Sequence, residues 1–145
     1  MEIKEINREL AYKFILAHHF ELMLNRVEYY QGKENLYKFW QDKYIYYGIF
    51  DNDKLVAIQI VNLNFDGWSY EKNRIKHSCH LIALQKIPNT KHGVFKVVLD
   101  YFSNLYKGKY IYLEVYVDKL KTMYESLGFK KVFKNNEHFY KLYID

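Results

Sequence analysis

Two residues in predicted strands have side chains whose types suggest proton-transfer chemistry. His80 lies in residues 77–84, directly before an apolar run, and Glu114 stands among the apolar and aromatic side chains of residues 110–117. Because an imidazole titrates near neutral pH without help, His80 could act as a general base, and His77 is a weaker second candidate. Glu114 could take the same role, or its carboxylate could simply accept a hydrogen bond from a neighbouring tyrosine hydroxyl. An isolated histidine on a strand is more often packed or solvated than catalytic. A catalytic role and a purely structural role therefore both stay open for these residues.

Residues 88–96, which read Pro-Asn-Thr-Lys-His-Gly-Val-Phe-Lys, suggest anion binding. Gly93 comes directly before a helical pattern, and backbone N–H groups at the N-terminus of a helix favour negative charge. Lys91 and Lys96 would add full positive charges. The segment therefore indicates a place where an anionic ligand could bind.

Other kinds of site are disfavoured by the cysteine and the paired histidines. Cys79 is the single cysteine, which excludes an internal disulfide and suggests a reducing compartment. It has no local signature of a nucleophile, and alternation places it in the core, on the face opposite His80. His18 and His19 have no partner at ligand spacing, so that we expect no metal site.

Composition predicts one domain over residues 1–145. Half of the 145 residues are hydrophobic, which is enough for a core of ordinary size. There is no apolar leader and no run of ~20 apolar residues, so we expect a soluble, cytoplasmic protein that does not bind membranes. The net charge of +5 suits an anionic ligand such as a nucleotide cofactor or RNA. Because the lysines are spread along the chain, nucleic acid is a possible but not a favoured partner.

The N-terminal half reads as a strand, two helices and a hairpin. Residues 2–6 alternate with period two and predict a short strand, after which Asn7 can cap a helix. That helix has four apolar positions at near-helical spacing: Leu10, Phe14, Ala17 and Leu22. A second helix is expected over 34–41. Residues 46–50 and 55–61 are rich in strand-forming types and flank the turn-forming residues 51–54, which predicts an antiparallel hairpin.

The C-terminal half alternates strands with helices. Strands are expected over 77–84, 110–117, 131–134 and 138–143, and a short helix over 118–127 that ends at Gly128. After Gly93 a further helix is expected, with Gly108 as its left-handed C-terminal residue and an apolar face made of Val94, Val98, Tyr101, Phe102 and Leu105. A strand, helix, strand sequence inside a meander implies an α/β chain with a mixed sheet and a right-handed parallel crossover.

This order of elements resembles the GNAT acetyltransferase superfamily, and so does the sequence of residues 124–132. Tyr124, two variable residues and then Leu127-Gly128-Phe129 match the family's usual ending, including the strand that resumes after it. The resemblance implies a GNAT-like acyl-CoA N-acyltransferase fold with about seven strands and four helices. It also implies a sheet that splays between the fourth and fifth strands, here 80–84 and 111–117, where acyl-CoA inserts.

The resemblance implies acetyl-CoA as acyl donor and no metal. The family's cofactor loop reads Arg or Gln, two residues, Gly, one residue, then Gly or Ala. In this chain Gly93 matches the first glycine, and Phe95 stands where the family has its second small residue. The position of the Arg or Gln falls on Thr90 or Lys91. The residues implied in cofactor binding are Leu84, Gln85, Lys86, Lys91, His92, Gly93, Val94, Phe95 and Lys96. Backbone N–H groups of this loop could cradle a pyrophosphate, and one near Leu84 or Gln85 could stabilise the oxyanion.

The resemblance also assigns catalytic roles for an N-acetyltransferase. Tyr124 would protonate the sulfur of the departing CoA, and the base would be Glu114, His80 or a chain of waters. The acceptor would be a primary amine of a small molecule, a peptide or a protein. Aromatic residues of the first two helices either shape the acceptor pocket or simply pack on the sheet: Phe20, Tyr29, Tyr30, Tyr37 and Trp40.

Two alternatives stay open beside this interpretation. A small basic member of the superfamily could acetylate aminoacyl-tRNA as a toxin. Phe95 and the segment 116–123, which is about two residues shorter than usual, favour instead a non-catalytic GNAT-like binding or inhibitory module. Edge strands at the C-terminus make a homodimer plausible.

Overall fold

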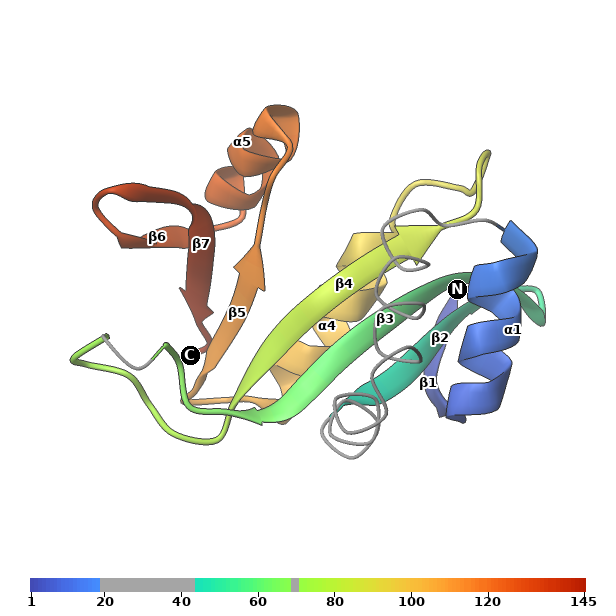
Figure 1. Ribbon diagram of the computed structural model, residues 1–145, viewed down its shortest axis with the longest axis horizontal. Coiled ribbons are helices and arrows are strands. Elements are labelled where there is room, and N and C mark those ends of the chain that lie inside the picture. The colour runs from blue at the N-terminus through green and yellow to red at the C-terminus, as the bar shows by residue number, and fades with distance from the viewer. Residues whose placement is uncertain (19–43, 69–70) are drawn as a thin grey trace. The chain divides into compact units, whose positions relative to one another are not determined.

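The computed structural model describes residues 1–18, 44–68 and 71–145 (Figure 1). Its strands form one seven-stranded sheet with the order β1-β2-β3-β4-β5-β7-β6. The elements are β1 (Glu2–Ile6), α1 (Arg8–His18), β2 (Ile45–Asp51), β3 (Lys54–Phe65), β4 (Ser78–Lys86), α4 (Val94–Leu105), β5 (Tyr110–Glu114), α5 (Asp118–Ser126), β6 (Lys130–Phe133) and β7 (Asn136–Tyr143). The predicted α/β mixed sheet is confirmed. The described residues hold three helices, and the helix predicted over 34–41 lies outside them.

The chain divides into two compact units, and β3, β4 and α4 each contribute to both. The first unit is Met1–Val61 with Ala83–Leu99, and the second is Asn62–Ile82 with Asp100–Asp145. The assignment of residues 1–145 to a single domain stays a prediction. Within the described residues, no helix combines the length and the apolar character needed to cross a membrane.

The first unit contains the predicted hairpin. β1, β2 and β3 pair antiparallel, and Asn52 and Asp53 form the turn between β2 and β3 with φ of 49° and 65°. Left-handed φ at two successive residues is what a tight hairpin needs, and Asn and Asp tolerate it. The predicted cap is also confirmed, because Leu10 N donates to Asn7 Oδ1 at 2.8 Å.

Helix α1 buries Phe14 as predicted, but the rest of its buried stripe differs from the predicted one. Its buried residues are Ala11, Tyr12, Phe14 and Ile15, whereas Leu10 is 41% exposed and Ala17 is exposed. The fourth predicted position, Leu22, lies outside the described residues. Tyr12 anchors the observed face, since its ring meets that of Tyr46 on β2 edge-on with centroids 5.9 Å apart. Two overlapping helical spacings were available, and packing on β2 selected the one that carries the tyrosine.

The second unit contains the predicted parallel pair. β4 and β5 pair in parallel from Cys79↔Ile111 to Leu81↔Leu113, and β5 also pairs antiparallel with β7, whose other neighbour is β6. Ile111, Tyr112 and Leu113 are all buried, as expected for a strand covered on both faces. Parallel pairing of the strands before and after helix α4 confirms the parallel crossover, and its right-handed sense stays a prediction.

Three details around α4 and β5 were predicted wrongly. Leu105 is 58% exposed at the end of α4. Gly108 has φ of 76°, but it lies in the turn that follows the helix rather than at its cap. β5 ends at Glu114, and Val117, expected in the core, is 47% exposed. Val117 is instead the residue from which α5 starts, so the strand cannot extend to it.

The end of the chain follows the prediction closely. α5 stops at Ser126, and Gly128 N donates to Glu125 O with a φ of 100° at the glycine. Such a left-handed residue ends a helix without the cost that a Cβ would bring. It turns the chain from α5 directly into Phe129 and β6.

Candidate active site

His80 and Glu114, the two candidate bases, lie side by side in the second unit. His80 is in register with Tyr112 on the neighbouring strand, and Glu114 follows Tyr112 by two residues, so that all three face the same side of the sheet. The Nε2 atom of His80 lies 3.9 Å from Oε1 of Glu114. The His80 side chain is 10% exposed and that of Glu114 is 27% exposed. The carboxylate is therefore the more accessible member of the pair.

Aromatic rings enclose the imidazole of His80. The ring of Phe65 has its centroid 4.6 Å away, and that of Trp68 lies 5.7 Å away and nearly edge-on. Trp68 also packs on Tyr112 and Phe139. Sequence reasoning missed Phe65 and Trp68, because they lie at the end of β3 and in the segment that follows it, where no pattern indicated a function.

Glu114 accepts the hydrogen bond that the sequence left open as an alternative to catalysis. The donor is Tyr116, whose Oη lies 2.6 Å from Oε2 of Glu114. Since Oε1 faces His80, the two contacts use different oxygens of one carboxylate. The hydrogen bond therefore does not exclude Glu114 from acid–base chemistry.

His77 does not share the strand with His80, contrary to the prediction. It precedes β4, is exposed, and has φ of 60°. Its backbone N donates to Oδ1 of Asp66 at 2.8 Å, and this bond holds the pKa of Asp66 below its usual value. His77 thus turns the chain into β4 and does not join the pair formed by His80 and Glu114.

Tyr124 is half-buried on α5. Its ring meets Phe129 with centroids 5.7 Å apart, and Phe129 N donates to the Tyr124 carbonyl. The helix is tied to β7 by the buried Tyr140, whose Oη donates to Glu125 at 2.9 Å. Burial raises the pKa of Tyr124, which keeps its phenol protonated at neutral pH. A protonated phenol is the form that an acid for a departing thiolate requires.

The proposed cofactor loop belongs to the first unit and starts α4. Gly93 has φ of 103°, and its carbonyl accepts from Val97 N at 3.1 Å, so the first turn of the helix starts here. A Cβ on Gly93 would meet no atom within 4 Å, which means that backbone conformation alone requires the glycine. Val94 is buried, Phe95 is half-buried, and the other predicted loop residues are exposed: Lys91, His92, Gly93 and Lys96.

Lys91 has a carboxylate partner. Its Nζ lies 3.7 Å from Oδ2 of Asp51, where the lysine side chain is 72% exposed and the aspartate 21%. The loop itself is anchored by Thr90 Oγ1, which donates to Ile87 O, and by Ile87 N, which donates to Val56 O. The positive charge expected at this loop is thus partly neutralised by the end of β2.

The last predicted cofactor residues, Leu84, Gln85 and Lys86, end strand β4. Leu84 and Gln85 are half-buried and Lys86 is exposed. Ala83, just before them, has its carbonyl bound by Nε2 of the buried Gln59 at 3.0 Å. A neighbouring strand therefore fixes the backbone where the oxyanion contact is predicted.

Solved structures resemble this chain over nearly its full length. For a histone acetyltransferase HPA2 and related acetyltransferase from Corynebacterium glutamicum, the TM-score is 0.66 at 12% identity, with 99% of this chain and 96% of that chain covered. The Bacillus subtilis N-acetyltransferase YlbP in complex with coenzyme A gives a TM-score of 0.63 at 18% identity, with 98% of this chain and 95% of that chain covered. AtaTR bound with acetyl-CoA gives a TM-score of 0.59 at 16% identity, with 97% of this chain and 91% of that chain covered.

The chain has the GNAT acetyltransferase fold. This confirms the resemblance first noticed in the ending Tyr124 to Phe129. No protein-family model matches the sequence, and no curated protein matches it either. The roles of the individual site residues stay predictions, as do those of the aromatic residues proposed for the acceptor pocket, Phe20, Tyr29, Tyr30, Tyr37 and Trp40, which lie outside the described residues.

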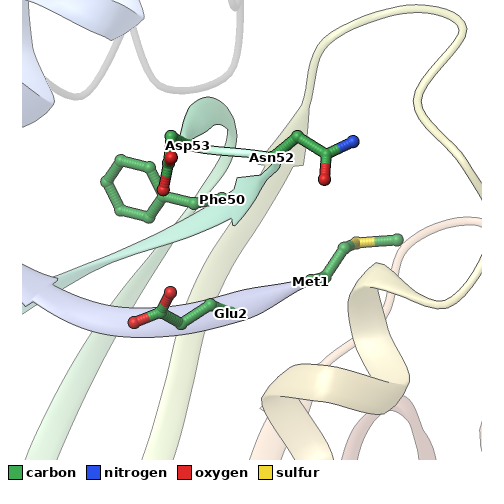
Figure 2. Close-up of a pocket in the computed structure, with 5 residues that line it drawn as sticks. All are labelled: Met1, Glu2, Phe50, Asn52 and Asp53. Atoms are coloured by element: carbon green, nitrogen blue, oxygen red, sulfur yellow. The ribbon is translucent and has the colours of Figure 1, made fainter.

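A surface hollow in the first unit does not involve the residues predicted for the site. The hollow has a volume of about 330 Å³, and Figure 2 shows the residues that line it: Met1, Glu2, Phe50, Asn52 and Asp53. None of the predicted site residues lines it.

In the described part of the chain, no group of His, Cys, Asp and Glu side chains could hold a metal ion. Burial raises the pKa of the Cys79 thiol, which leaves this thiol unreactive.

Proposed function

We propose that the chain is an N-acetyltransferase that transfers an acetyl group from acetyl-CoA to a primary amine. The observation that carries the proposal is the contact between Glu114 and His80, 3.9 Å apart and partly shielded from solvent, in a chain with the GNAT fold. Tyr124 lies in the same compact unit, with its phenol protonated. These residues supply the acid and the base that acyl transfer to an amine needs.

In this mechanism each proton has a defined donor and acceptor. Acetyl-CoA would supply the thioester carbonyl that the amine attacks. The Glu114 carboxylate, supported by His80, takes a proton from the acceptor's ammonium group, and the nitrogen lone pair then forms the new C–N bond. The C–S bond would then break, and the departing thiolate would take the phenolic proton of Tyr124. The nitrogen, which carries one proton too many after the attack, would return that proton to the Tyr124 phenolate to leave the neutral amide. Without the base the amine would stay protonated at neutral pH and could not attack.

Acetyl-CoA binding would rest largely on the loop 88–96. The helix start at Gly93 offers backbone N–H groups to a pyrophosphate, and Lys91, His92 and Lys96 are exposed around it. Backbone N–H groups do not depend on side-chain identity. For this reason Phe95, in place of the family's second small residue, does not by itself remove the cradle.

A calorimetric titration of acetyl-CoA into the full chain tests this proposal. We expect saturable binding, and Gly93→Trp should weaken it by about a hundredfold or more, because two or so charge-assisted hydrogen bonds would be blocked. Gly108→Trp is the matched control, since Gly108 also has positive φ and open space around it, with φ of 76°. Failure to bind at millimolar acetyl-CoA would overturn the proposal in favour of a non-catalytic GNAT-like module.

A second acceptor class follows from the likeness to AtaT, which is described as a toxin in complex with its antitoxin. With a net charge of +5, the chain could instead act on an anionic acceptor such as aminoacyl-tRNA. Thiol release from acetyl-CoA, followed with a panel of small amines, lysine-containing peptides and aminoacyl-tRNA, separates the two classes. Turnover with the tRNA that falls steeply with added salt would favour the second.

A further inference from the structure

The Glu114 carboxylate is held from two directions. Oε1 lies 3.9 Å from Nε2 of His80, and Oε2 accepts the hydrogen bond from Tyr116 at 2.6 Å. A carboxylate that turns about its side-chain bonds would exchange these two oxygens or lose both contacts. The hydrogen bond from Tyr116 thus fixes which oxygen is presented to the imidazole.

Tyr116 is in turn held by His138 of β7. The two rings stack with centroids 4.5 Å apart and an angle of 29° between their planes. His138 is fastened to the residue before Tyr116, because its Nδ1 lies 3.0 Å from Val115 O and its carbonyl accepts from Val115 N at 2.8 Å. Tyr116 is 65% exposed and follows the end of β5, where a side chain would otherwise sample several rotamers. Stacking on His138 restricts that freedom.

We propose that Tyr116 is a positioning residue, which orients the Glu114 carboxylate toward His80 so that the two side chains accept a proton as one unit. The catalytic value of this orientation rests on the proposed function, whereas the electrostatic coupling between Glu114 and His80 does not. Neither Tyr116 nor His138 was singled out by the sequence, where Tyr116 is one of three tyrosines in the run 110–117.

The charges around His80 make this coupling measurable. The Glu114 carboxylate lies next to the imidazole, and Phe65 and Trp68 contribute uncharged rings. Tyr112, the register partner of His80, donates to Glu71, and Glu71 pairs with Lys141. That second carboxylate is therefore neutralised by its own partner. A change in the orientation of Glu114 should therefore shift the midpoint of the His80 titration.

The experiment is an NMR titration of the His80 imidazole in the full chain, with its signals assigned by His80→Asn among the six histidines. An opposite charge at this distance favours the imidazolium, so that Glu114→Gln should lower the midpoint of the His80 titration by about one pH unit. Tyr116→Phe keeps the stacked ring and loses only the hydroxyl. We expect it to lower the midpoint by about half as much, because the charge remains but is no longer directed at Nε2.

Tyr143→Phe is the matched control, since Tyr143 is also exposed and packs against a neighbouring aromatic ring, that of Tyr110. It should leave the midpoint unchanged. A His80 midpoint that moves in Glu114→Gln but not in Tyr116→Phe would overturn the positioning role, and one that moves in neither would overturn the pair. Since the titration needs no acetyl-CoA, failed cofactor binding would remove the proposed function and leave this result standing.

Discussion

The two regions assigned to acetyl transfer are built in opposite ways. In the second unit, His80 is 8% exposed, lies among aromatic rings and meets Glu114 from the neighbouring strand. In the first unit, the loop that would bind the cofactor keeps Lys91, His92, Gly93 and Lys96 exposed. One region is assembled from distant segments and shielded, while the other is local and open.

The difference follows from what each task requires. A base must have its protonation controlled, and this needs neighbours that exclude water and place a charge at a defined distance. A loop that binds a pyrophosphate needs backbone N–H groups and a left-handed glycine, which a few consecutive residues can provide. Substitutions in the shielded region should therefore have large and specific effects, and substitutions of single loop side chains small ones.

The largest effect is expected for Glu114→Gln. Removal of the proposed base should lower kcat by about 100- to 1000-fold with an accepted amine, because general-base catalysis contributes that much. The affinity for acetyl-CoA should stay unchanged. The matched control is Glu137→Gln, on the same unit, where the side chain is 70% exposed. Full activity in Glu114→Gln would show that a water chain or another group takes the proton.

Glu71→Gln should have the next largest effect, on stability rather than on chemistry. The Glu71 side chain is 7% exposed, pairs with Lys141 of β7 and accepts from Tyr112 at 3.2 Å. Its loss leaves the ammonium group of Lys141 without its carboxylate, which should lower the free energy of unfolding by about 3 kcal/mol in a urea titration. The pair of Glu9 with Lys13, whose side chains are 79% and 74% exposed, should contribute under about 1 kcal/mol when Glu9→Gln is tested in the same way. Equal losses in the two variants would contradict the distinction between buried and exposed pairs.

Tyr124→Phe should have a smaller effect, which depends on pH. Burial raises the pKa of Tyr124, so the wild-type phenol stays protonated through neutral pH and loses its proton only in strongly alkaline solution. The variant should lower kcat by about ten- to a hundredfold at neutral pH, since thiolate is a better leaving group than most and needs less help from an acid. The alkaline fall in kcat should disappear with the hydroxyl. A rate equal to that of wild type would make Tyr124 a packing partner of Phe129 and nothing more.

The sequence predicted what depends on local patterns. The turn at Asn52 and Asp53, the cap at Asn7 and the end of α5 at Gly128 were all expected, because each is determined by residues within four positions of it. The mixed sheet and the parallel pair followed from the sequence of strands and helices. The exposed loop at Gly93 was recognised for the same reason.

Contacts between distant segments could not be predicted in this way. The enclosure of His80 by Phe65 and Trp68, and the bond from Tyr116 to Glu114, depend on which strands become neighbours and where each of them ends. The strand predicted over 110–117 included Val117, but β5 ends at Glu114 because α5 starts at Asp118. Helical spacing alone also could not choose between the stripes of α1, because that choice was made by Tyr46 on β2.

The smallest effects are expected for the charged side chain of Lys91 in the loop and for its partner Asp51, and there the direction of the change in affinity is informative. Lys91 is 72% exposed and lies 3.7 Å from Asp51, so the aspartate competes with any bound phosphate for the same ammonium group. Lys91→Ala should weaken acetyl-CoA binding only about threefold, as exposed ion pairs contribute little. Asp51→Asn should tighten binding by a similar factor, since it releases Lys91 toward the ligand and removes a repulsive charge. Calorimetry on both single variants and the double variant measures the coupling: if Lys91 acts on the cofactor, the gain from Asp51→Asn should shrink once Lys91 is replaced, and an equal gain in both backgrounds would mean that Asp51 acts on the ligand directly.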